Sequence, residues 1–256
     1  MLSSDQFPSA RFSGDEYPGR PVRPPVPRWH TASARGPRSV NADAVSAFAR
    51  AGQDIVFALA DGVGDEAGAA RAARVAASVA ARTPASEGPV AAILAAQRAV
   101  RELPSGDAVL VVAMPFEDGR GFRVAWVGDA RAYRWTADTL SQVTTDHTLA
   151  QYFRDHGQPA APRMEHVVTT SVRTTRPGEI GTAETRSGGL VLTSDGVHKV
   201  LTVETMRDVL ARPGDTASAL VETAISLGCS DNATTLLIES PGLLADLTTV
   251  QLTVAA

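Results

Sequence analysis

The chain has 256 residues, a formal net charge of −4 and 44% hydrophobic residues, so it is long enough for one large domain or two small ones with a substantial core. The sequence has no cluster of basic residues of the kind that binds nucleic acid, and no apolar run approaches the roughly 18 residues of a membrane span. The single cysteine, Cys229, excludes an intramolecular disulfide and fits a reducing compartment. Because Asp5 and Gln6 lie where a signal peptide would be apolar, we expect a cytoplasmic protein.

The first 38 residues differ in composition from the rest of the chain. They contain seven Pro and six Arg against three acidic residues, and they show no hydrophobic periodicity. Such a composition is typical of a flexible tail. We therefore predict a Pro- and Arg-rich tail at 1–30, a folded domain at 31–240 and a C-terminal extension at 241–256.

The first half of the domain begins with an apolar run that ends in Asp-Gly, 54–62, and predicts a buried strand. Two helices follow, an Ala-rich one at 66–83 and a second at 89–103 that has Pro in its first turn. A run of three strands is expected next, the first two joined by a hairpin at Asp118-Gly119, with the ranges 108–116, 121–128 and 130–136.

The second half mixes both kinds of element. The pattern predicts helices at 146–157, 203–212 and 215–228, and strands at 165–172, 181–186, 190–193 and 233–239. Strands come in runs and helices in pairs, instead of alternating strictly. This grouping favours an α+β fold with antiparallel sheets over a doubly wound parallel sheet.

Several carboxylates lie at the ends of these apolar runs. They are Asp61, Asp129, Asp195 and Asp231, with Asp43 just before the first strand-like segment. A single Asp-Gly pair is more often a turn than a site, and Asp118-Gly119 keeps that interpretation.

A cluster of carboxylates would be costly, since like charges repel and raise one another's pKa, unless a cation offsets the charge. With oxygen ligands and no Cys or His motif, the natural cations are Mg²⁺ or Mn²⁺, and a pair of them roughly 3.5–4 Å apart would clamp a phosphate and activate a bridging water.

Six segments, in order over 31–239, resemble motifs of the metal-dependent Ser/Thr protein phosphatases of type 2C in their compact bacterial form. The segments read GPRSVNADAV, FALADGVGDEAG, FRVAWVGDARAYRW, QVTTDHTLAQYF, LVLTSDGVHKVLT and GCSDNATTLLI. The resemblance implies a four-layer α-β-β-α sandwich with two central antiparallel sheets. It also implies hydrolysis of phosphoserine and phosphothreonine in proteins.

The resemblance assigns roles to particular residues and implies two Mn²⁺ or Mg²⁺ ions. The implied metal ligands are Asp61, which bridges both ions, the Gly62 carbonyl, Asp195, Asp231, and Asp43 through a water. Arg38 would bind the substrate phosphate bidentately, a geometry suited to guanidinium. Asn232 would hold the loop around Asp231.

The sequence also departs from the family pattern. Lys199, the only lysine in the chain, stands where many members have an Asp that joins the Asp129 equivalent at a third metal. We therefore hypothesise that Lys199 pairs with Asp129 and that the site holds two ions. The other departures are Ala42 for a Glu or Gln, Asp65 for a Gly, Asp107 for a Thr and Ala130 for a Ser.

The predicted function is metal-dependent hydrolysis of phosphoserine and phosphothreonine in proteins, with a metal-bridged water as the attacking group. We expect the protein to be a monomer that opposes bacterial Ser/Thr kinases. Its partners would be phosphoproteins, with a Ser/Thr kinase or its targets among them. We expect no nucleic-acid partner and no membrane span. One alternative is a degenerate phosphatase fold that serves as a regulatory or binding module, and another is an unrelated metallohydrolase of small phosphate esters. His147 and His198 are further candidates, as proton donors to the leaving oxygen, although no metal-ligand spacing supports them.

Overall fold

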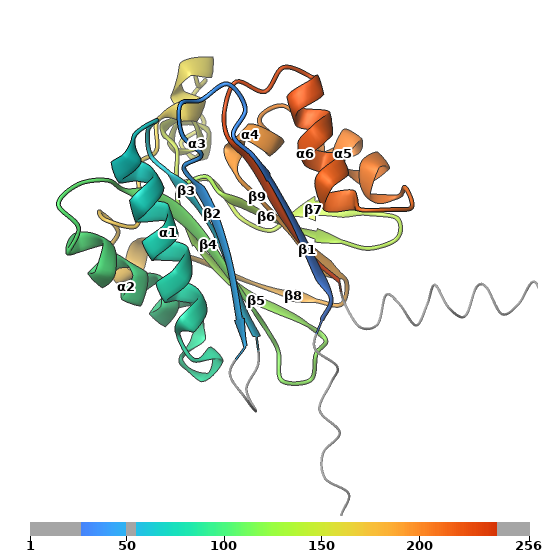
Figure 1. The fold of residues 1–256 in the computed structure, drawn as a ribbon, viewed down its shortest axis with the longest axis horizontal. Helices are drawn as coiled ribbons and strands as arrows, with labels where there is room; N and C mark the ends of the chain where they lie inside the picture. Colours follow the sequence, from blue (N-terminus) through green and yellow to red (C-terminus); the bar gives the residue numbers. More distant parts are fainter. Residues whose placement is uncertain (1–26, 50–54, 240–256) are drawn as a thin grey trace, which may run out of the picture.

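Two antiparallel sheets stack against each other between two layers of helices (Figure 1). This computed structural model describes residues 27–49 and 55–239. One sheet has the strand order β1-β10-β9-β6-β7 and the other β2-β3-β4-β5-β8. The strands are β1 Trp29–Ala34, β2 Asp43–Ala49, β3 Ile55–Gly62, β4 Ala108–Pro115, β5 Gly121–Val127, β6 Arg131–Trp135, β7 Leu140–Gln142, β8 Gly181–Arg186, β9 Gly189–Thr193 and β10 Ala233–Ile238. The predicted α-β-β-α sandwich is confirmed.

The helices lie on the outer faces of the sheets. Two cover the sheet that contains β3 and three cover the sheet that contains β10, while α3 lies at one end of the sandwich (Figure 1). The α-helices are α1 Ala67–Arg82, α2 Gly88–Arg101, α3 Leu149–Asp155, α4 Asp195–His198, α5 Val203–Leu210 and α6 Thr216–Ser226, and short 3-10 turns occur at Ala85–Glu87, Pro162–His166 and Pro177–Glu179.

The side chains of β3 show how the layers are held together. Val56, Ala58 and Ala60 pack into the cluster beneath α1 and α2, whereas Phe57 and Leu59 pack into the cluster between the two sheets. Successive side chains of a strand point to opposite faces, so a strand buried on both faces is apolar throughout. A third cluster lies between the other sheet and α4 to α6. The two sheets are therefore fixed relative to each other by packing on both faces.

Most predicted elements agree with the structure, with ends that differ by a few residues. The strand predicted at 165–172 is wrong, because this segment runs from a 3-10 turn into a loop and makes only an isolated bridge, between Val168 and Thr148. Its backbone bonds the chain just before α3, where the Leu149 amide donates to the Val167 carbonyl at 2.8 Å. The helix predicted at 146–157 begins only at Leu149, since Thr148 caps it by accepting from the Gln151 amide.

Three strands, β1, β2 and β7, were not predicted. The strand β1 is largely exposed at a sheet edge and lies within the first 38 residues, so the tail-like composition does not prevent residues 29–34 from pairing with β10. Most of the proposed tail and the extension at 241–256 lie outside the described residues, and the domain limits stay a prediction. No helix in the described ranges is long and apolar enough to cross a membrane.

Candidate active site

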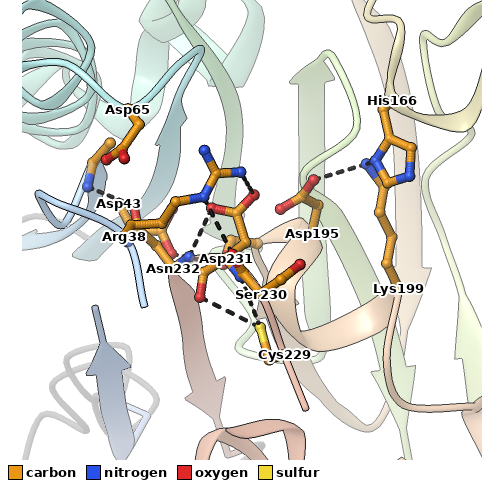
Figure 2. A network of polar contacts seen from close by, with 12 residues as sticks. Arg38, Asp43, Asp65, His166, Asp195, Lys199, Cys229, Ser230, Asp231 and Asn232 are labelled. Carbon is orange, nitrogen blue, oxygen red and sulfur yellow. Dashed lines mark hydrogen bonds and ion pairs between the residues drawn. The ribbon is translucent and has the colours of Figure 1, made fainter. Parts of the chain in front are cut away.

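The predicted metal-ligand carboxylates come from strand ends at one end of the sandwich. Asp43 opens β2 and Asp61 lies near the end of β3, and the antiparallel register places these two residues directly opposite each other. Asp195 follows β9 as the first residue of α4, and Asp231 precedes β10, the neighbour of β9. Figure 2 shows Asp43, Asp231 and Asp195 in one close view. The structure thus brings together carboxylates that are far apart in the sequence and come from both sheets.

Burial and neighbouring carboxylates raise the pKa of Asp61 and Asp43. Burial is the largest cause that raises the pKa of Asp61 well above its ordinary value, and the charges of Asp43, Asp195, Asp129 and Asp231 raise it further. Burial likewise raises the pKa of Asp43 to about 6, although hydrogen bonds to Thr234 and Ser194 oppose the shift. Close like charges with little water favour either a proton or a bound cation. This end of the sandwich is therefore a site of strong negative potential.

The donor set fits a hard divalent cation. Asp43 Oδ1 is buried and has no hydrogen-bond partner in the described part of the chain, so one of its oxygens is left for a ligand. Gly62 adds a backbone carbonyl in a position that only glycine fits, because a Cβ there would lie 2.7 Å from the Ala69 carbonyl. Carboxylate and carbonyl oxygens are the ligands that Mg²⁺ and Mn²⁺ prefer.

Two of the carboxylates bind cations of the chain itself. Arg38 Nη2 donates to Asp231 Oδ2 at 2.5 Å, and Arg38 Nε donates to the Ser230 carbonyl at 3.3 Å. Lys199 Nζ donates to Asp195 Oδ2 at 2.7 Å. Within residues 27–49 and 55–239, no three His, Cys, Asp or Glu side chains form a ready-made metal site. Asp195 and Asp231 are therefore each paired with a cation of the chain in the structure.

Asn232 fixes the loop that carries Arg38. Its side-chain oxygen accepts from the Ala42 amide at 2.7 Å, and its Nδ2 donates to the carbonyls of Arg35 and Val40 at 2.8 and 2.9 Å. Its backbone amide donates to Asp231 Oδ1 at 2.7 Å. Asn232 thus joins the Arg38 loop to the residue before β10, which agrees with the role that the resemblance implies.

Comparison with solved structures identifies the fold. Serine/threonine phosphatase Stp1 from Staphylococcus aureus matches with a TM-score of 0.73 and 20% identity over 86% of this chain and 98% of that one. The phosphatase MsPP from Mycobacterium smegmatis, a PPM Ser-Thr phosphatase solved with cacodylate, matches with a TM-score of 0.65 and 26% identity over 83% and 97%. The catalytic domain of phosphatase PstP, solved with 2 manganese ions, matches with a TM-score of 0.67 and 26% identity over 84% and 98%. No family model and no curated protein matches the sequence.

The chain has the fold of the PPM serine/threonine phosphatases. The resemblance predicted from the six motifs is confirmed, and the structures matched are serine/threonine protein phosphatases. They also support divalent metal dependence in this fold, since one of them contains manganese.

The predicted ion pair between Lys199 and Asp129 is confirmed. Lys199 Nζ lies 2.9 Å from Asp129 Oδ2, in addition to its contact with Asp195. Burial by itself would lower the pKa of Lys199, but the carboxylates of Asp195 and Asp129 raise it above its ordinary value. Lys199 Nζ also lies 3.5 Å from His166 Nδ1, so the loop after α3 reaches this side of the site.

The other departures from the PPM pattern have local structural consequences. Ala42 is buried against Ala69 and Ala70, in a small apolar cluster. Asp107 accepts from the Ala108 and Arg173 amides at 2.8 and 2.9 Å and from Ser171 Oγ at 2.6 Å, so it ties β4 to the loop before β8. Asp107 is therefore a hydrogen-bonding residue of the scaffold in this chain.

The two histidines considered as proton donors make contacts away from the carboxylates. His198 is buried, its Nδ1 lies 3.0 Å from Thr193 Oγ1, and burial lowers its pKa well below the ordinary value. His147 Nδ1 accepts from the Gly128 amide at 3.3 Å, and its ring stacks on Trp126. These contacts give no support to a proton-donor role for either residue.

Sequence reasoning missed two residues of the site. Ser194 Oγ donates to Asp43 Oδ2 at 2.7 Å, and Asp65 contacts the residues that follow Arg38. Ser194 precedes a predicted ligand in the sequence, which is a weak signal, but the partner of its hydroxyl group is 151 positions away.

Proposed function

We propose that this chain is a metal-dependent protein phosphatase that hydrolyses phosphoserine and phosphothreonine in proteins. The observation that supports it most is the set of partly buried carboxylates at one end of a PPM-type sandwich, with an arginine beside them. Bacterial serine/threonine phosphatases share this fold with the chain.

In this proposal two Mn²⁺ or Mg²⁺ ions bind at the carboxylates. Asp61 would bridge them, and the ligands around it would be the Gly62 carbonyl, Asp195, Asp231, and Asp43 through a water. The ions would supply Lewis-acid polarisation of the phosphoryl group and activate the attacking water that they bridge. Asp43 Oδ1 is buried and has no hydrogen-bond partner among the described residues, and burial followed by neighbouring carboxylates raises the pKa of Asp61. These two residues are therefore the strongest part of the proposed ligand set.

Arg38 would bind the phosphate of the substrate. Its guanidinium lies against Asp231 and is about one-third exposed, so it is accessible to an incoming anion. If Asp231 held a metal ion, Arg38 Nη2 would lose this partner, and Nη1 and Nη2 could then donate in parallel to phosphate oxygens.

The direct test is release of phosphate from a phosphothreonine peptide with Mn²⁺ and with chelator. We expect turnover only with the metal, and loss of turnover in Asp61→Ala and Asp195→Ala. Asp118→Ala is the matched control, because Asp118 lies in the exposed hairpin between β4 and β5 and should leave turnover unchanged. A preference for nucleotides or sugar phosphates over phosphopeptides would instead favour a metallohydrolase of small esters.

The number of ions is a second part of the proposal. Lys199 lies between Asp129 and Asp195, so we propose that the site takes two ions and that the ammonium occupies the place of a third. Mn²⁺ titration should find two sites in the wild type and an additional site in Lys199→Asp. A Lys199→Asp variant without the additional site would contradict this part alone.

A regulatory or binding module without activity is the second candidate. It is favoured by the ion pairs of Arg38 with Asp231 and of Lys199 with Asp195, since each holds a predicted metal ligand. If the wild type neither binds Mn²⁺ nor releases phosphate, this candidate replaces the phosphatase.

For the phosphatase, we further propose a cytoplasmic monomer that opposes Ser/Thr kinases by acting on their targets.

A further inference from the structure

Asp65, in the turn between β3 and α1, makes a group of hydrogen bonds that the proposed reaction does not use. Its carboxylate accepts from the Ser39 amide at 3.2 Å on both oxygens, and its Oδ1 also accepts from Ser39 Oγ at 3.1 Å and from the Val40 amide at 3.3 Å. Ser39 Oγ additionally lies 3.3 Å from the Asp65 carbonyl. Hydrogen bonds from Ser39 are the largest cause that lowers the pKa of Asp65 below its ordinary value. A single side chain thus binds two consecutive residues of another segment.

Ser39 and Val40 follow Arg38 directly, so their hydrogen bonds to Asp65 fix the backbone next to Arg38. From the other side, Arg35 Nη1 donates to the Arg38 carbonyl at 2.8 Å, and Asn232 binds the Val40 carbonyl. Figure 2 shows Asp65 on one side of Arg38 and Asn232 with Asp231 on the other. The short loop is therefore held on both flanks while the Arg38 side chain reaches Asp231.

We propose that Asp65 is a positioning residue, which holds the Ser39–Val40 backbone so that Arg38 is directed at the phosphate-binding place of the site. This inference rests on the proposed function, in which Arg38 binds phosphate. An arginine has several rotatable bonds, and ordering its backbone in advance lowers the entropy lost when it binds an anion. Removal of the carboxylate frees the loop and weakens phosphate binding without removing any ligand of a metal ion.

The test uses three variants of the full chain. Asp65→Ala removes all the side-chain hydrogen bonds, and Asp65→Asn keeps an oxygen that accepts from the two amides. Glu66→Ala is the matched control: it removes a negative charge one residue away, from a side chain that makes no capping hydrogen bond. The measurements are amide hydrogen exchange over residues 35–42, the affinity of the Mn²⁺-loaded protein for inorganic phosphate by calorimetry, and KM and kcat on a phosphothreonine peptide.

In Asp65→Ala we expect faster exchange at Ser39 and Val40, roughly fivefold to tenfold weaker phosphate binding and a rise in KM of similar size, with little change in Mn²⁺ affinity. Asp65→Asn should restore most of the affinity, and Glu66→Ala should match the wild type. Unchanged exchange and unchanged phosphate affinity in Asp65→Ala overturn the inference. An equal loss in Glu66→Ala also overturns it, since the effect would then be one of charge.

The exchange measurement separates this inference from the proposed function. If the wild type binds neither Mn²⁺ nor phosphate, the proposed function fails and with it the role of Arg38. Faster exchange confined to Asp65→Ala would still show that Asp65 holds the loop, whereas unchanged exchange would remove that role as well.

Discussion

The two sides of the carboxylate cluster differ in what balances their charge. On one side, Asp43 and Asp61 face each other across β2 and β3, and Asp43 Oδ1 has no hydrogen-bond partner among the described residues. On the other side, the ammonium of Lys199 lies between Asp129 and Asp195. Both sides are buried, so the difference lies in the source of the cation and not in exposure to water.

The two sides differ in how far the chain itself offsets their negative charge. A buried carboxylate without a cation is costly, and the raised pKa values of Asp43 and Asp61 report that cost. Burial also raises the pKa of Asp129, but the nearby ammonium of Lys199 opposes this shift, so the charge is partly compensated within the chain. The β2–β3 side therefore has no cation of the chain beside it, whereas Lys199 partly offsets the charge on the other side.

The largest effect is expected from Asp61→Asn. We expect turnover to fall by roughly a thousandfold or more, because a neutral amide does not bridge two cations. In chelator the same variant should be more stable than the wild type, since it removes a buried charge repelled by four other carboxylates. Phosphate release and urea unfolding with and without Mn²⁺ measure both effects. Turnover within tenfold of the wild type would contradict the assignment.

The next effect is expected from Lys199→Met, which removes the ammonium but keeps much of the length of the side chain. Asp129 and Asp195 would lose their cation, and we expect a loss of about 3 kcal/mol in the free energy of unfolding. Urea unfolding of this variant and of Lys199→Arg, which keeps the charge, provides the measurement and its control. If the methionine variant is as stable as the wild type, the two sides of the cluster do not differ as described.

The smallest effect is expected from Ser194→Ala, on the side without a chain cation. The Ser194 hydroxyl donates to Asp43 at 2.7 Å and accepts from the Thr234 amide at 2.9 Å. Its loss should lower the free energy of unfolding by about 1–2 kcal/mol and weaken Mn²⁺ binding a few-fold, because Asp43 is no longer oriented. Ser226→Ala on the exposed end of α6 is the control, and equal effects in both variants would remove the role of Ser194.

Much of the fold was predictable because the central strands are buried on both faces. The runs of β3 and β4 are apolar throughout, and such runs are visible in a sequence. The strand β1 escaped prediction because it is polar and mostly exposed, and its pairing with β10 joins residues that are about 200 positions apart. The segment 165–172 has the composition of a strand, but it pairs with the chain before α3 and not with a sheet.

The candidate residues were predictable from the sequence, but their partners were predictable only in part: the pair of Lys199 with Asp129 was expected, and most other contacts were not. Asp61, Asp195 and Asp231 became candidates because carboxylates at the ends of apolar runs are unusual and because the motifs occur in order. The contacts of Lys199 with Asp195 and of Asp65 with Ser39 depend on which way side chains turn once distant segments meet. Composition and spacing carry no information about that orientation.

The ammonium between Asp129 and Asp195 is attached covalently to the chain. Its effective concentration is set by the length of a side chain and not by the composition of the solution. A chelator therefore cannot extract it, and a shortage of metal cannot deplete it. One part of this carboxylate cluster is thus partly compensated from the moment the chain folds, whereas in the proposed metal-dependent phosphatase the other part would respond to the supply of divalent ions.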